Sequence, residues 1–124
     1  MIGIIEKDQI ANQNSYNLEE STNYHGNGYK YPGNFKEGSG FRTGDIVETI
    51  VKLNEGCIQW IVNNEIQAAT IKPRLSAPNK KFVPYIDLGT IRDCVEWVDS
   101  KYIWGADDDD SINKINMFHI FDIY

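Results

Sequence analysis

"GDIVETIVKLNEGCIQWIVNNEIQAAT", residues 44–70, decides the fold class, because three apolar-polar alternating runs are separated there by turn signals. In the first run Val47 and Val51 share one face, and this period of two is typical of a strand. Gly56 permits the left-handed backbone of a tight turn, and the asparagines at residues 63–64 tolerate the same conformation. The stretch therefore predicts an antiparallel meander of three strands.

Runs of strand length also flank this meander, and no segment before residue 98 has apolar residues at helical spacing. We expect an all-β chain, with strands near residues 2–5, 45–53, 57–62, 66–71, 82–88 and 94–98. The side chains expected to be largely buried are Trp60, Val62, Val95 and Trp97. Residues 6–40 are polar and rich in Asn, Gly and Tyr, and we expect loops with short strands there, the best candidate being residues 28–32.

The last part of the chain, residues 99–124, has a different character. The acidic run from Asp107 to Asp110 favours a solvated linker, whereas the run from Ile115 to Ile123 is apolar on both faces. A strand that is apolar on both faces is typical of burial on two sides. We expect two parts, a sandwich at residues 1–98 and a C-terminal extension at residues 99–124.

Length, net charge and cysteine content limit the classes of partner and the cellular compartment that we expect. A chain of 124 residues fits one domain, and its net charge of −6 argues against a nucleic-acid partner, which favours a clustered basic face. Neither a signal peptide nor a run long enough to span a membrane is found, so an intracellular, cytoplasmic location is the default expectation. Cys57 and Cys94 lie in apolar runs, which favours buried free thiols; a disulfide would indicate an oxidising compartment.

The sequence offers no pattern for catalysis or metal binding. Its two histidines, His25 and His119, have no further Cys or His at the short spacing that a zinc site uses. Neither has a Ser or Cys nucleophile in a pattern typical of catalysis. The run from Asp107 to Asp110 lacks the glycine and glutamate offsets of an EF-hand calcium loop. We expect no enzymatic activity, no cofactor and no metal.

The order of these signals resembles the SPRY domain. The segments that carry the resemblance are "IGII" (2–5), "YHGNGYKYPG" (24–33), "GD" (44–45), "WIVNNE" (60–65), "FVPYIDLG" (82–89) and "DCVEWV" (93–98). The likeness covers about residues 2–98 and departs from the family at Asn64, where a glycine is usual. The first strands of the family would precede "IGII", so either the chain is a piece of a longer polypeptide or another segment completes the sheets.

The resemblance implies a bent, concanavalin-like sandwich of two antiparallel sheets that binds partner proteins or peptides through loops at one end. Those loops fall at residues 23–32 and 89–93. The expected contact residues are Tyr29, Tyr31, Thr90, Ile91 and Arg92. The function expected is therefore a non-catalytic protein-interaction module within a larger protein or assembly. The alternative is a carbohydrate-binding module, because concanavalin-like lectins share the sandwich and tyrosine-rich loops could form a sugar platform.

A sandwich that begins at "IGII" would leave strand edges unpaired, and such edges pair with any available strand. We expect the run from Ile115 to Ile123 to be a paired strand. It could dock on this sandwich, in place of the absent strands, or on a neighbouring chain. The edge from Met1 to Ile5 is the other expected place for pairing with another chain.

Overall fold

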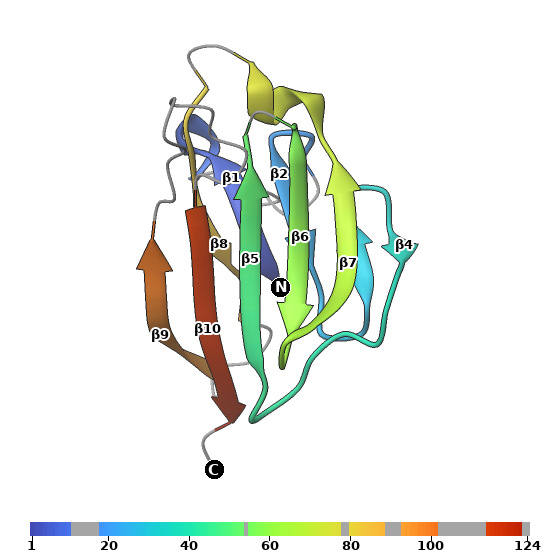
Figure 1. The fold of residues 1–124 in the computed structure, drawn as a ribbon, viewed down its shortest axis with the longest axis vertical. Coiled ribbons are helices and arrows are strands. Elements are labelled where there is room, and N and C mark those ends of the chain that lie inside the picture. Colours follow the sequence, from blue (N-terminus) through green and yellow to red (C-terminus); the bar gives the residue numbers. More distant parts are fainter. Residues whose placement is uncertain (11–17, 54, 78–79, 89–92, 102–113, 123–124) are drawn as a thin grey trace.

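The computed structural model describes the chain except for residues 11–17, 54, 78–79, 89–92, 102–113 and 123–124. Two antiparallel sheets pack against each other as a β-sandwich, and the described residues contain no α-helix (Figure 1). The all-β prediction is confirmed. In this described part no helix has the length and apolar character needed to cross a bilayer.

Each sheet has five strands, and segments that are distant in sequence lie side by side in both. One sheet, here sheet A, runs in the order β4 (Phe35–Lys36), β3 (Tyr29–Tyr31), β2 (Ser21–Tyr24), β1 (Ile2–Glu6) and β8 (Phe82–Ile86). The other, sheet B, runs in the order β7 (Glu65–Ile71), β6 (Cys57–Val62), β5 (Ile46–Lys52), β10 (Lys114–Asp122) and β9 (Asp93–Lys101). Among the described residues, single turns of 3-10 helix, η1 (Lys7–Gln9) and η3 (Pro73–Ser76), follow β1 and β7.

The predicted meander is confirmed as β5, β6 and β7, which are consecutive antiparallel neighbours. Both turns adopt the left-handed backbone that the sequence indicated, with φ 61° at Gly56 and φ 50° and 69° at Asn63 and Asn64. The Asn63 amide also accepts a hydrogen bond from the N–H of Ile46 (3.0 Å) and donates one to Asp45 (2.8 Å). The second turn therefore fixes the start of β5 as well as the register of β6 and β7.

The polar segment before the meander is more regular than expected. β3 lies within the predicted residues 28–32, but β2 is a fully buried strand, so the segment expected to be a loop at residues 23–32 is a hairpin. An apolar pattern could not reveal β2, because three of its four buried side chains, those of Ser21, Thr22 and Asn23, are polar. They form local hydrogen bonds instead: Thr22 Oγ1 donates to the carbonyl of Ser21 (2.8 Å), and the Asn23 amide donates to Ser21 Oγ (3.2 Å).

Trp60 joins the two sheets at the centre of the core. Its side chain is 0% exposed, and its indole stacks on the ring of Tyr24 in sheet A, with 5.6 Å between centroids. The indole N–H donates to the carbonyl of Ile2 at 3.0 Å. The predicted burial of Trp60 and Val62 is confirmed, whereas Val95 is only partly buried. The side chain of Trp97 lies outside the described residues.

The prediction of buried free thiols can be checked at Cys57 but not at Cys94. Cys57 is a buried free thiol, as expected, and burial raises the pKa of that thiol. The Lys52 ammonium lowers the pKa in opposition, but by less than burial raises it. The side chain of Cys94 lies outside the described residues.

The C-terminal strand completes sheet B of the same chain. β10 pairs with β5 on one side and with β9 on the other, which confirms the predicted strand and its docking on this sandwich (Figure 1). The division expected between residues 98 and 99 falls inside β9. β1 also has a neighbour on each side, β2 and β8. Both segments expected as places of pairing with another chain are thus inner strands, and the sheet edges among the described residues are β4, β8, β7 and β9.

Candidate functional site

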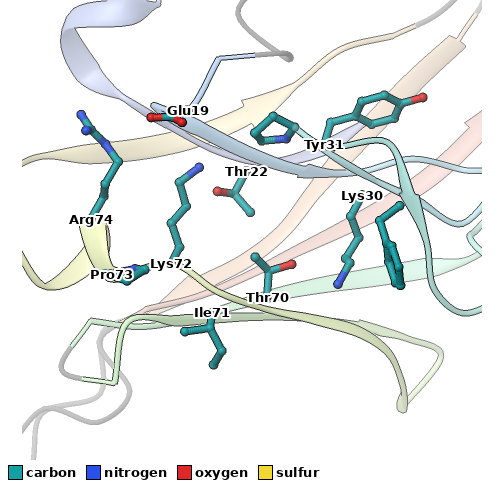
Figure 2. Close-up of a pocket in the computed structure, with 11 residues that line it drawn as sticks. Glu19, Thr22, Lys30, Tyr31, Thr70, Ile71, Lys72, Pro73 and Arg74 are labelled. Carbon is teal, nitrogen blue, oxygen red and sulfur yellow. The ribbon is translucent and has the colours of Figure 1, made fainter.

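A groove of about 390 Å³ lies where the β3–β4 end of sheet A meets the end of β7 in sheet B (Figure 2). We call it the edge groove. Its charged lining residues are Glu19, Lys30, Lys72 and Arg74, and its apolar and aromatic ones are Tyr31, Pro32, Phe35, Ile71 and Pro73. Two threonines, Thr22 and Thr70, complete it. It therefore combines three basic side chains with exposed apolar surface.

One ion pair ties the two sheets together at the groove. The Lys30 ammonium lies 2.9 Å from Glu37 Oε1 and donates to the carbonyl of Ala69 on β7 (2.8 Å), while Glu37 Oε2 accepts the N–H of Ala69 (2.8 Å). Burial opposes ionisation of Glu37, but the hydrogen bonds from Lys30 and from the N–H of Ala69 outweigh it and lower the pKa of that carboxyl. Both main-chain groups of Ala69 are thereby occupied at the edge of sheet B.

The groove carries two strongly exposed apolar side chains, one from each sheet. Phe35 on β4 is 63% exposed and Ile71 at the end of β7 is 73% exposed. Phe35 follows a tight turn at Gly33 and Asn34, which have φ 104° and 53°, and the Lys30 ammonium lies 5.2 Å from its ring centroid. Ile71 stands at the rim, with its side chain turned away from the middle of the groove (Figure 2). Exposed apolar groups gathered at one hollow are typical of an interaction surface.

Lys72 extends from the end of β7 into the groove, where Figure 2 shows it between Arg74 and Thr22. Its ammonium donates to the carbonyl of Ser21. Burial, and to a lesser degree the charge of Arg74, lowers the pKa of Lys72 to about 8 against the opposing effect of nearby carboxylates. No ion pair joins Lys72 to a carboxylate among the described residues. It is therefore a half-buried cation whose charge is weakly compensated.

Arg74, by contrast, is paired with a carboxylate. Its Nε and Nη2 atoms both contact Glu6 Oε2, at 2.8 and 2.5 Å, and Lys80 lies 3.2 Å from Glu6 Oε1. Glu6 is 3% exposed, so this carboxylate is buried under two cations. Burial raises its pKa, but the hydrogen bonds and charges of Arg74 and Lys80 outweigh that effect and leave the pKa below its ordinary value. The cluster anchors η3 to β1 behind the groove.

This cluster predicts a pH-dependent stability. Because the folded pKa of Glu6 is lowered, its stabilisation is present above the unfolded value of 4.5 and is lost as the pH falls toward the folded pKa. We expect Glu6→Gln to lower the free energy of unfolding at pH 7 by roughly 2 kcal/mol. Urea titrations should show this difference shrinking below about pH 4.5. Glu65→Gln, at an exposed position of β7, is the charge-matched control. A difference that stays constant from pH 7 to pH 3 would contradict the assignment.

The sequence-predicted contact residues are only partly brought to the groove. Tyr29 and Tyr31 lie two residues apart on β3 and so share a face; Tyr31 lines the groove, and its ring meets His25 edge-on at 6.3 Å. Tyr29 does not line it, and its ring centroid lies 6.0 Å from the Lys36 ammonium. Thr90, Ile91 and Arg92 lie outside the described residues.

Sequence reasoning missed most of the groove. Phe35 carried a usable signal, since it is an isolated aromatic residue in a polar, glycine-rich segment. The basic residues carried no such signal. Lys30, Lys72 and Arg74 line one groove only because β3 and η3 lie near one another in the fold. Solvated lysines are common, and position in sequence does not separate them from a half-buried one.

The chemistry of the described residues includes no set of three or more His, Cys, Asp or Glu side chains arranged to hold a metal ion. The groove offers ammonium groups, hydroxyls and apolar surface, which suit binding of a ligand. Comparison of the chain with protein-family models, curated proteins and solved structures finds no match. The SPRY resemblance stays a prediction.

Proposed function

We propose that the chain is a non-catalytic protein-interaction module that binds an extended peptide segment of a partner protein in the edge groove. The observation that carries this proposal is the exposure of Phe35 at the groove, together with that of Ile71 at its rim. Apolar anchors beside a pocket with a polar surround are the usual source of binding energy in protein interfaces. Tyr31 also lines the groove.

A peptide suits the groove better than a sugar. A sugar ring stacks on an open aromatic face and hydrogen-bonds to planar amide or carboxylate groups. Phe35 is the most exposed aromatic ring at the groove, and the Lys30 ammonium already lies over its face. An extended peptide needs only apolar contacts and a few polar partners, which the groove supplies. Carbohydrate binding is therefore the second candidate and an outcome of the test.

The test is selection of binding peptides from a displayed random library, followed by affinity measurement on groove variants. We expect Phe35→Ala combined with Ile71→Ala to weaken binding of the selected peptides tenfold or more, because each apolar anchor contributes roughly 1–2 kcal/mol. The melting temperature should change little, since both side chains are exposed. Tyr31→Ala should weaken binding by roughly 1–3 kcal/mol if it acts as an anchor.

Ile66→Ala is the matched control, because Ile66 is a similarly exposed isoleucine on β7 (64%) that does not line the groove. Binding should be unchanged in that variant. Selected peptides that bind the double variant as tightly as the unaltered chain would remove the groove as the site. Glycans that bind on an array and are lost in the double variant would instead favour the carbohydrate-binding function.

A further inference from the structure

The three basic side chains of the edge groove differ in how their charges are compensated. Lys30 is paired with Glu37, and Arg74 is paired with Glu6. Lys72 is the one of the three that pairs with no carboxylate among the described residues, and its hydrogen-bond acceptor there is the carbonyl of Ser21. An ammonium group has three donors, so Lys72 has donor capacity to spare inside the groove.

We infer that Lys72 is the binding point for a carboxylate of the partner, so that the module selects acidic peptide segments. This inference rests on the proposed function of the groove. A carboxylate that reaches Lys72 would gain a charge-assisted hydrogen bond with a cation already half removed from water. Because Phe35 and Ile71 line the same groove as Lys72, the acidic residue should have apolar neighbours in the bound segment.

The carboxylates around Lys72 do not fully compensate its charge, so the groove can accept one added negative group. Glu6, from β1, is neutralised by Arg74 and Lys80, while Glu19 and Glu20, just before β2, act on Lys72 without an ion pair in the structure. Glu19 lies at the groove and is exposed, so it repels an incoming carboxylate and competes with it. Removing the charge of Glu19 should therefore strengthen acidic binding.

A carboxylate fits this point better than a phosphate group. Phosphate recognition uses several donors at once, commonly the fork of an arginine. The fork of Arg74 is directed at Glu6 through both Nε and Nη2. The Nε and Nη2 edge of Arg74 is therefore already used by Glu6, whereas the ammonium of Lys72 can bind a single carboxylate.

The main-chain position of Lys72 is fixed, which makes the ammonium a placed group. Its N–H donates to the carbonyl of Gly56 at 2.5 Å, and Pro73 begins η3 immediately after it. The side chain lies along the wall toward β2 (Figure 2). A placed cation loses less conformational entropy on binding than a free surface lysine does.

The experiment uses three pools of acetylated, fluorescein-labelled heptapeptides whose central residue is Glu, Gln or Lys, flanked by Leu, with uncharged residues elsewhere. By fluorescence anisotropy at pH 7, we expect the Glu pool to bind roughly tenfold more tightly than the Gln pool. The preference should vanish in Lys72→Met and survive in Lys72→Arg. Lys81→Met, which removes an exposed charge outside the groove, is the matched control.

Two further readouts do not depend on Lys72→Met being well folded. Glu19→Gln should raise affinity for the Glu pool severalfold and leave the Gln pool unchanged. In the unaltered chain the preference for Glu should fall as the pH rises above 8, where Lys72 loses its proton, while the Gln pool shows no such change.

The inference and the proposed function fail in different ways. Equal binding of the Glu and Gln pools, both lost in the Phe35→Ala and Ile71→Ala double variant, would overturn the carboxylate site and leave the peptide groove. A Glu preference that persists in Lys72→Met would also overturn it. If none of the pools binds, both proposals are wrong.

Discussion

Deletion of residues 112–124 is expected to abolish the cooperative unfolding transition of the chain. β10 lies between β5 and β9, and β9 has no other neighbour in sheet B, so the deletion removes two strands from a sheet of five. β5 would become an edge strand, and its buried side chains Val47 and Val51 would lie at that open edge. The resulting decrease in the free energy of unfolding should exceed the total stability of a domain of this size, which is roughly 5–15 kcal/mol. Thermal unfolding followed by circular dichroism would measure it.

The control for this deletion is a chain shortened by residues 123–124 alone, which retains β10 and should keep its melting temperature. Size-exclusion chromatography of the longer deletion should show aggregates, because an exposed inner strand pairs with other chains. A monomer with an unchanged melting temperature would show that β10 contributes nothing to the sandwich.

Trp60→Ala is expected to destabilise the fold by roughly 3–5 kcal/mol, which is typical for loss of a fully buried large side chain. The substitution removes the stacking on Tyr24 and the hydrogen bond to the carbonyl of Ile2, both of which link sheet B to sheet A. Urea titration should show a lower midpoint with little change in slope.

Trp60→Phe separates the two contributions. The aromatic contact with Tyr24 can persist, while the donor to Ile2 is lost, so we expect a smaller cost of roughly 1–2 kcal/mol. Phe35→Ala, an aromatic truncation at the surface, should change stability by less than about 0.5 kcal/mol. Equal effects of Trp60→Ala and Phe35→Ala would contradict the placement of Trp60 at the core.

The sequence predicted the meander and the C-terminal strand because both rest on local signals. Alternation in β5 and the turn residues Gly56 and Asn63 fix strands and register without reference to the rest of the chain. β2 was not predicted, because its burial depends on hydrogen bonds among Ser21, Thr22 and Asn23 that compensate for polar side chains. Composition alone does not reveal such compensation.

The candidate site was harder to predict than the fold. Tyr31 was expected as a contact residue because a loop implied by the SPRY resemblance falls at residues 23–32, and it lines the groove. Lys72 and Phe35 are far apart in sequence and line one groove only because β4 and β7 are the sheet edges at the same side of the sandwich. A property that arises from tertiary packing has no local sequence signature.

The ion pair of Lys30 and Glu37 has a consequence for how the protein behaves among copies of itself. By taking up the N–H and the carbonyl of Ala69, these two side chains imitate the main chain of a further strand. They therefore block strand pairing at Ala69, near the middle of the edge strand β7. Loss of this ion pair would therefore leave the N–H and the carbonyl of Ala69 open to pairing with another chain.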